Sequence, residues 1–251
     1  MISIKRKKFG ISLSEVYFAK TESDMSLQTA VNLCVQCEKQ LAGFYPFKTR
    51  IVDLLMPEDR IFSAFSSTTR NEVRRAEKEG FRAGVEFSPG PEQIAEFACF
   101  YDSFSRLKRI PACNRNKLSA LARAGALAIT SVPGSDGVPL GRHAYVIDRS
   151  ARRARFLYSA SLFRGMDSSS DRNLIGRVNR YLHWCDMRIF KNTGIDLYDL
   201  GGIPMDDSDP VLNAIADFKM KFGGCTLVEY NGMIPGSRLG KVLLALHKKL
   251  R

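Results

Sequence analysis

The sequence has no long apolar run. No segment approaches the ~20 consecutive apolar residues that a membrane-spanning helix requires. The cationic start MISIKRKK is not followed by the apolar core of a secretory signal. We therefore expect a cytoplasmic protein. The sequence also lacks low-complexity tracts and internal repeats of roughly 20–50 residues, which argues against a solenoid or a repeat array.

Motifs for metal binding and covalent catalysis are scarce. The six cysteines are scattered, and without a secretion signal this favours reduced thiols over a disulfide framework. Cys34 and Cys37 form a single CxxC with no second pair at zinc spacing, inside a stretch (27–41) whose spacing predicts a helix. No GxSxG elbow accompanies the three histidines. We expect no metal site and no covalent serine or cysteine intermediate.

Basic residues are abundant. The 251 residues include 38 Lys and Arg against 26 Asp and Glu, which gives a net charge of +12 within an otherwise ordinary soluble composition. The basic residues form separate clusters and no single tail. An anionic partner is therefore expected, but charge alone does not distinguish a nucleotide cofactor, a nucleic acid or a lipid headgroup.

Hydrophobic spacing and turn residues predict an α/β (α+β) chain. We expect a strand or hairpin over 10–19, helices over 27–41 and 58–79, and strands over 49–55 and 81–87. Helices over 92–107 and 114–124 precede an antiparallel meander over 126–132, 140–148 and 155–160. A long helix over 171–193, a strand over 195–200, a helix over 210–222, a strand over 225–230 and a basic helix over 237–250 follow.

Several strings together resemble the FemAB-like branch of the GNAT acyltransferase superfamily. NRYLHWCDMRIFKNTGIDLYDLGGI and FKMKFGGCTLVEYNG resemble its C-terminal part, where a helix bearing an LHW-type segment leads into YDFGG and FKxxFGG. TRIVDLL and TTRNEVRRAEKEGFRAGVEF resemble the upstream part, and FACFYDSFSRLKR resembles the first catalytic-domain helix. The resemblance covers most of residues 45–232, and the predicted element order agrees with it.

The resemblance implies a GNAT-like fold, in which a mixed central sheet is flanked by helices and its two middle strands splay apart to admit a cofactor. FemAB-like proteins usually carry two tandem GNAT domains. This chain has room for one complete domain, over 81–251, preceded by an α/β segment over 1–80 that resembles a partial unit.

The activity implied is acyl transfer from acyl-CoA to an amine or hydroxyl of an amino sugar or another cell-envelope or polysaccharide precursor. One alternative is the aminoacyl-tRNA-dependent transfer of FemAB-like enzymes to a peptidoglycan-type precursor. A second alternative is a non-catalytic basic protein on a GNAT scaffold that contacts nucleic acid or an anionic membrane, with KVLLALHKKLR as part of its contact surface. No recognition motif for sequence-specific DNA binding is present.

The resemblance also implies catalytic residues. Phe218 and Lys219 match the Phe–Lys pair that lies beside the reacting carbonyl in FemAB-like enzymes, so Lys219 is expected to stabilise the developing negative charge. Asp199 lies at a strand end among apolar residues, where a carboxylate is costly unless it is hydrogen-bonded or acts as a base. Asp199 either anchors the turn at Gly201 and Gly202, or it binds substrate or acts as a catalytic base.

The donor is expected at the start of the 171–193 helix, where free amides and the helix dipole favour phosphate. The residues predicted to bind it are Arg172, Asn173, Gly176 and Arg177. The acyl-CoA loop of the superfamily, Q/R-x-x-G-x-G/A, is matched here only at Gly176.

For the acceptor, two pairs of residues are candidates. Tyr158 and Ser159 precede the long helix on a strand that is expected to line the cleft. Lys108 and Arg109 follow the FACFYDSF helix, where the family presents a basic residue to an anionic acceptor such as a nucleotide-linked sugar.

Overall fold

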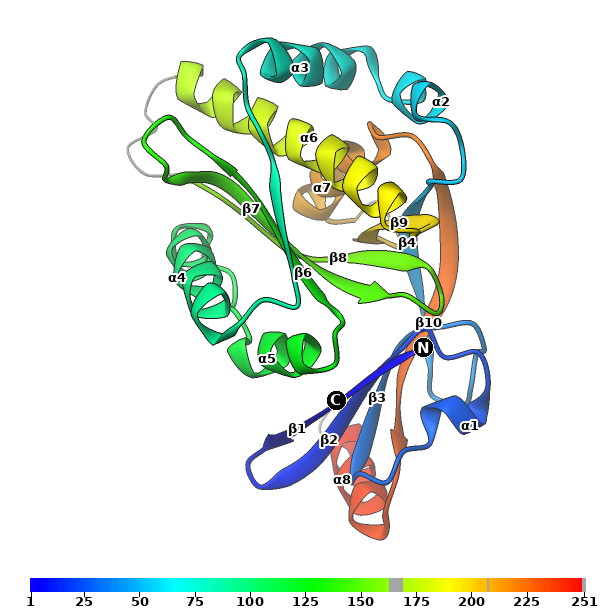
Figure 1. Cartoon of the computed structure of the whole chain (residues 1–251). Helices are drawn as coiled ribbons and strands as arrows, with labels where there is room; N and C mark the ends of the chain where they lie inside the picture. The colour runs from blue at the N-terminus through cyan, green and yellow to red at the C-terminus, as the bar shows by residue number, and fades with distance from the viewer. Residues whose placement is uncertain (163–168, 207, 250–251) are drawn as a thin grey trace.

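The computed structural model describes residues 1–162, 169–206 and 208–249, whose strands form one ten-stranded mixed sheet (Figure 1). The strands are β1 (Ile2–Lys8), β2 (Ile11–Tyr17), β3 (Val31–Cys37), β4 (Tyr45–Asp53), β5 (Gly84–Phe87), β6 (Leu127–Pro133), β7 (Pro139–Asp148), β8 (Arg153–Ser161), β9 (Leu197–Ile203) and β10 (Cys225–Pro235). The helices are α1 (Glu22–Met25), α2 (Glu58–Ser63), α3 (Ser67–Lys78), α4 (Pro91–Lys108), α5 (Arg115–Arg123), α6 (Ser169–Asn192), α7 (Pro210–Met220) and α8 (Arg238–Lys249).

The strand order β1-β2-β3-β10-β4-β9-β8-β7-β6-β5 interleaves distant parts of the chain. β6 to β8 form the predicted antiparallel meander, and β5 pairs antiparallel with β6 at its edge. β8 continues the sheet through a parallel pair with β9. The long strand β10 pairs with both β3 and β4, and β4 also pairs with β9. Strands from the segment 1–80 therefore flank β10 within the sheet.

Helices cover both faces of the sheet. Helices α4 and α5 lie on one face and α3, α6 and α7 lie on the other (Figure 1). Alternate residues of β6 and β7 supply the two cores, because successive side chains of a strand point to opposite faces. Leu127 and Val146 pack with α4 and α5, whereas Ala128 and Tyr145 pack with α6. The predicted GNAT-like layering is thus confirmed.

Two predictions of local structure are wrong. The stretch 27–41 contains the strand β3, not a helix. β3 is hydrogen-bonded on both sides, and both its faces bury apolar residues, so its pattern is not the alternation of a half-exposed strand. The helix expected over 58–79 is two helices, because the Ser66 hydroxyl accepts a hydrogen bond from the Thr69 amide and starts α3 afresh.

Cys34 and Cys37 are buried in β3, and the six cysteines are free thiols. Of the helices in the described ranges, none has the length and hydropathy needed to cross a bilayer.

Candidate active site

The middle strands β8 and β9 diverge. They pair only where residues 153–155 of β8 face residues 197–199 of β9. β8 then continues to Ser161 beside β7, and β9 continues to Ile203 beside β4, with no ladder between them. The predicted splay of the two middle strands is therefore present, and it begins directly after Arg155 and Asp199.

Lys219 lies at this divergence. It is in the last turn of α7, and its Nζ donates a 2.6 Å hydrogen bond to the carbonyl oxygen of Gly202 on β9. A Cβ on Gly201, which has φ +77°, would lie 3.4 Å from the Phe156 carbonyl oxygen of β8 and 3.7 Å from Lys219 Nζ. The ammonium therefore contacts the β9 backbone beside Gly201, where that glycine also approaches the backbone of β8.

Burial lowers the pKa of Lys219 to about 8, although the nearby Asp199 carboxylate opposes this shift and Arg155 adds to it. The side chain is therefore mostly a cation at neutral pH and loses its charge just above it. A partly buried cation of this kind can stabilise a developing oxyanion more strongly than a solvated one.

Phe218, the other member of the predicted pair, packs inside the fold. Its ring lies 5.3 Å from that of Phe222 and 5.8 Å from that of His183, and the Arg180 guanidinium lies 5.4 Å from its centroid. Burial lowers the pKa of Arg180, and its Nε has no hydrogen-bond partner. Arg180 is thus a second cation near this site that the sequence analysis did not select.

Asp199 is fully buried and closely surrounded by donors. Its carboxylate accepts hydrogen bonds from Thr49 Oγ1, from Gln36 Nε2 at 2.8 Å, from Arg153 Nη2 at 2.7 Å and from the Gly201 amide at 2.8 Å. Burial by itself would raise the pKa of this carboxyl, but Arg153, Arg155 and the hydrogen bonds lower it overall. These contacts favour the anchoring alternative over a base, because the anion is already satisfied.

Asp199 belongs to a larger buried set that we call the ionic cluster: Gln36, Thr49, Arg153, Arg155, Asp199 and Glu229. Arg153 donates to Glu229 at 2.6 Å as well as to Asp199, and Gln36 Nε2 donates to Glu229 at 2.9 Å. The cluster joins β3, β4, β8, β9 and β10 where β8 and β9 part. No local pattern marks it, since its members lie up to 193 residues apart.

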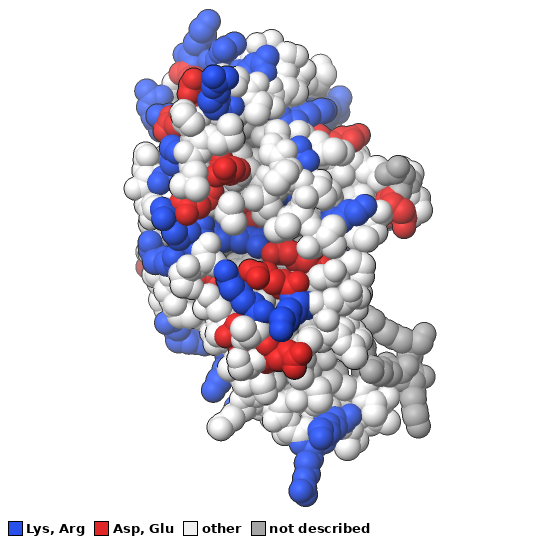
Figure 2. Space-filling model, turned by 90° about the vertical axis from the view of Figure 1, so that its right-hand side faces the viewer, with Lys and Arg blue, Asp and Glu red and all other residues white. Residues whose placement is uncertain are grey.

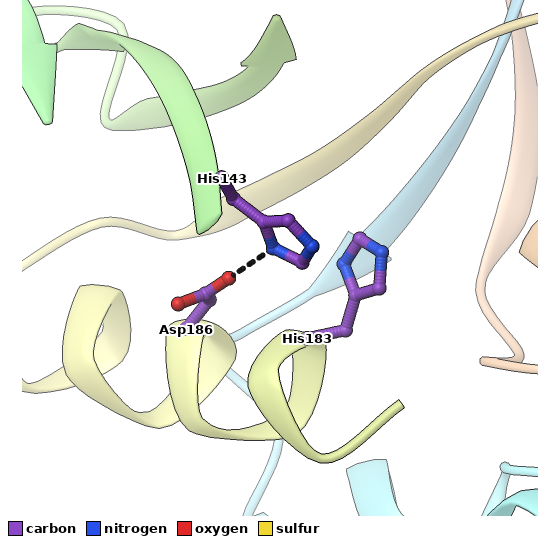
Figure 3. Close-up of side chains that lie close together, drawn as sticks. All are labelled: His143, His183 and Asp186. Atoms are coloured by element: carbon purple, nitrogen blue, oxygen red, sulfur yellow. Dashed lines mark hydrogen bonds and ion pairs between the residues drawn. The ribbon is translucent and has the colours of Figure 1, made fainter. Parts of the chain in front are cut away.

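A second buried set, the histidine cluster, lies between the sheet and α6 and consists of His143, Tyr145, His183, Asp186 and Tyr198. Figure 3 shows His143 and Asp186 in contact, with His183 beside them. Hydrogen bonds join His143 Nδ1 to Asp186 Oδ2 at 2.8 Å, Tyr145 OH to Tyr198 OH at 2.7 Å and Tyr198 OH to His183 Nδ1 at 2.6 Å. Burial lowers the pKa of His183 well below its ordinary value, so this imidazole is neutral.

Two imidazoles and a carboxylate are also a donor set for transition metals. The donor atoms of His143, His183 and Asp186 lie within 4.8 Å of one another. However, His143 Nδ1 and Nε2 already face Asp186 and Asn179, and His183 Nδ1 faces Tyr198. The arrangement is that of a hydrogen-bonded core holding α6 against β7 and β9.

The predicted donor-binding residues occupy the first turns of α6. Arg172 and Asn173 are exposed there. Arg177 is buried and forms ion pairs with Glu72 at 3.0 Å and Glu79 at 2.7 Å, which join α6 to α3. The carbonyl oxygen of Gly176 accepts a hydrogen bond from Arg180. Within this set, Arg172 and Asn173 are the members exposed to a ligand, while Arg177 has an evident structural role.

The predicted acceptor residues are dispersed. Tyr158 lies on β8 beyond the divergence and faces α4 and α5, with its ring 4.8 Å from that of Tyr101 and its hydroxyl accepting from the Asn114 amide. Burial raises its pKa to about 12. Ser159 is paired with His143 in the β7–β8 ladder. Lys108 and Arg109 are exposed at the C-terminal end of α4, which lies on the face of the sheet opposite α6 and α7 (Figure 1).

A cavity of about 780 Å³ lies between β2, β3, β10, α5 and α8. On its wall the buried Glu15 accepts from Lys117 Nζ at 2.8 Å and from Arg6 at 2.6 Å. Apolar side chains such as Leu33 and Met233 form other parts of the wall. Its size and its few convergent polar groups are typical of a small-molecule site. No local sequence pattern marks this cavity, because its walls come from both ends of the chain.

No protein-family model matches the sequence, and no curated protein matches it significantly. Solved structures do match. FemX aligns over 96% of this chain and 85% of its own length with a TM-score of 0.63 and 14% identity. The C-terminal domain of a protein described as a lysylphosphatidylglycerol synthetase, from Agrobacterium fabrum, aligns over 96% and 83% with a TM-score of 0.54 and 15% identity.

The L-PGS structure from Bacillus licheniformis aligns over 88% of this chain and 72% of its own length, with a TM-score of 0.53 and 17% identity. These alignments cover most of the chain, as the sequence resemblance had led us to expect. The chain therefore shares its fold with FemX and with these two synthetase structures.

Proposed function

We propose that the protein is an acyltransferase in which an activated carbonyl enters between β8 and β9 and reacts beside Lys219. The observation that carries this proposal is the position of Lys219 Nζ, 2.6 Å from the Gly202 carbonyl oxygen where the two strands part. In direct transfer, an amine or hydroxyl of the acceptor attacks the carbonyl carbon, the carbonyl oxygen becomes an oxyanion, and the donor's leaving group departs as the carbonyl re-forms. The Lys219 ammonium stabilises the oxyanion.

The test is Lys219→Met, which keeps much of the side-chain volume and removes the charge. Loss of one oxyanion donor typically slows the chemical step by about 10²–10³-fold, so we expect this loss in single-turnover transfer, with the fold retained. Lys221→Met, a charge removal two residues further along the chain, is the control and should leave the rate within about twofold. Equal rates for wild type and Lys219→Met would contradict the proposal.

For the donor we propose acyl-CoA, held by Arg172, Asn173 and Gly176 at the start of α6. The alternative donor is aminoacyl-tRNA. The structural similarity to FemX and to a lysylphosphatidylglycerol synthetase supports this alternative. A donor at 100 times its dissociation constant stabilises the fold by about 2.7 kcal/mol. Thermal unfolding with coenzyme A and, separately, with tRNA therefore distinguishes the two, and stabilisation by tRNA alone would replace acyl-CoA with the alternative.

For the acceptor we propose an amino sugar or other cell-envelope precursor that binds in the 780 Å³ cavity. Lys117 and Lys241 line the cavity against a single carboxylate, that of Glu15, which also pairs with Arg6. This excess of positive charge suits an anionic precursor such as a nucleotide-linked sugar. Lys117→Gln should then raise the apparent KM for the acceptor more than it lowers kcat.

Peripheral contact with an anionic membrane is part of the same proposal. On α8, Leu239, Val242 and Leu246 are more than half exposed and follow i, i+3, i+7 spacing. Arg238 and Lys241 are exposed beside them. A non-catalytic basic binder has less support, since Figure 2 shows acidic side chains among the basic ones on the face it presents. Such a binder would keep its salt-dependent binding in Lys219→Met.

A further inference from the structure

A second cavity, of about 730 Å³, lies between α4, the β6–β7 hairpin and the end of β8. Phe100, Phe104 and Leu107 of α4, Val138 of the hairpin and Leu162 after β8 form its apolar walls. It shares no lining residue with the cavity beside Glu15 and Lys117, and Lys219 does not line it. Leu107 and Val138 are about half exposed, so part of the apolar wall faces solvent.

One charged side chain of this cavity is buried without adequate neutralisation. Arg142 on β7 is only 6% exposed, and its Nε has no hydrogen-bond partner. Its ion-pair partner, the Glu96 carboxylate, lies 3.7 Å from Nη2 and is itself 58% exposed. This distance exceeds that of a charge-assisted hydrogen bond. A guanidinium removed from water in this way destabilises the protein unless an anion compensates it.

Packing alone does not require an arginine at this position. On the same face of β7, Ala144 and Val146 belong to the apolar core beneath α4 and α5. An apolar residue at 142 would continue that pattern without a desolvation cost. The charge is therefore better explained by a ligand than by the fold, and it differs in this respect from Arg153 and Arg177, whose guanidinium groups have carboxylate partners within 3.0 Å.

We propose that this cavity binds an amphiphilic anion, with a carboxylate or phosphate on Arg142 and an aliphatic or aromatic chain against Phe100, Phe104 and Leu107. The volume lies in the range of pockets that enclose small ligands, and one buried charge on an otherwise apolar wall fixes the orientation of such a molecule. The proposal does not depend on the chemistry at Lys219, and its binding assay requires no acyl donor.

Titration calorimetry with decanoate and with decyl phosphate, each below the concentration at which it forms micelles, tests the proposal. We expect saturable one-to-one binding of at least one of them, and the better of the two identifies the anionic group. Decanol carries the chain without the charge and acetate the charge without the chain, so each should bind at least about tenfold more weakly. Binding of decanol as tight as that of decanoate, or no saturable binding of either anion, would overturn the proposal.

Substitutions of Arg142 distinguish a ligand-binding role of this residue from a structural one. Arg142→Gln should weaken binding at least about tenfold, whereas Arg115→Gln, which removes the same charge from an exposed ion pair with Asp102, should change nothing. Arg142→Met should unfold at the same or a higher temperature than the wild type without ligand, because a costly charge is gone. A clearly lower unfolding temperature for this variant, with unchanged affinity in Arg142→Gln, would make Arg142 structural.

A substitution at the exposed Glu96 tests the proposal independently, because it leaves the buried Arg142 unchanged. Glu96→Gln removes the negative charge that pairs with Arg142 and competes with the ligand, so it should tighten binding of the same anion by a few-fold. Unchanged or weaker binding in this variant would count against the proposal even if Arg142→Gln could not be purified.

Discussion

Strand β9 carries two buried polar clusters of different chemistry on its two faces. Asp199 points into the ionic cluster, and the preceding residue, Tyr198, points into the histidine cluster. The ionic cluster sets two guanidinium groups against two carboxylates and connects five strands. The histidine cluster depends largely on imidazole and phenol groups and connects the sheet to α6. Tyr198 and Asp199 are the last residues of β9 that pair with β8, so the two clusters stabilise the point of divergence from opposite faces of the sheet. Lys219 contacts the β9 backbone just beyond this point, at Gly202.

Of the two clusters, the ionic cluster should cause the larger loss in free energy of unfolding when one member is removed. Arg153→Met leaves Asp199 and Glu229 buried without their main cation and should lower the free energy of unfolding by about 3–5 kcal/mol. Arg152→Met, which removes the adjacent and half-exposed ion pair with Asp196, is the matched control and should cost about 0–1 kcal/mol. Urea unfolding of both variants measures the difference, and equal costs would refute the distinction.

The ionic cluster also influences the charge of Lys219, whose pKa of about 8 reflects burial, opposed by Asp199. Only the protonated side chain can stabilise an oxyanion, so its contribution should fall about tenfold per pH unit above pH 8. Lys219→Arg stays charged throughout this range. The ratio of wild-type to Lys219→Arg transfer rates should therefore decline above pH 8, and a flat ratio would show that the charge of Lys219 is not used.

On the other face, the histidine cluster should respond to mild acid. The pKa of His183 lies well below its ordinary value of 6.5, so the unfolded chain binds a proton that the folded chain does not. Stability should therefore fall as the pH drops below about 6.5, by up to about 1.4 kcal/mol per unit from this residue. The pKa of Asp199 is lowered from 3.8, so its contribution is present above that value and is lost only in stronger acid.

His183→Phe, which keeps an aromatic ring against Phe156, Phe218 and Phe222, is the test of this pH dependence. The free energy of unfolding of the variant should depend less steeply on pH between about 6.5 and 5 than that of the wild type. Chemical denaturation at several pH values measures both slopes. Identical slopes would mean that His183 does not cause the loss of stability in mild acid.

The smallest effect is expected from a single hydroxyl of the histidine cluster. Tyr198→Phe removes the oxygen that contacts His183 Nδ1 and Tyr145 OH but keeps the ring in the core. The loss should be about 1–2 kcal/mol, since two buried groups lose a partner without a cavity being formed. A cost as large as that of Arg153→Met would show that the two clusters are equally sensitive.

Several parts of this molecule were accessible from sequence because their signals are local. The meander, the long helix α6 and the FKMKFGG segment were predicted close to their observed positions. The resemblance indicated Lys219 and the parting strands together. In contrast, β3 was mistaken for a helix, since a strand with buried residues on both faces lacks the alternation that identifies a half-exposed strand.

The sequence by itself determined the order of elements from β5 onward, the excess of positive charge and the Phe218–Lys219 pair. Only the tertiary structure decided which buried charges have partners. Arg153 meets Asp199 and Glu229 at 2.6–2.7 Å because three separate strands converge, whereas the ion pair of Arg142 within the described residues is longer, 3.7 Å, and joins it to an exposed Glu96. Desolvation and Coulomb energies depend on distance and burial in space, and neither is encoded by spacing along the chain.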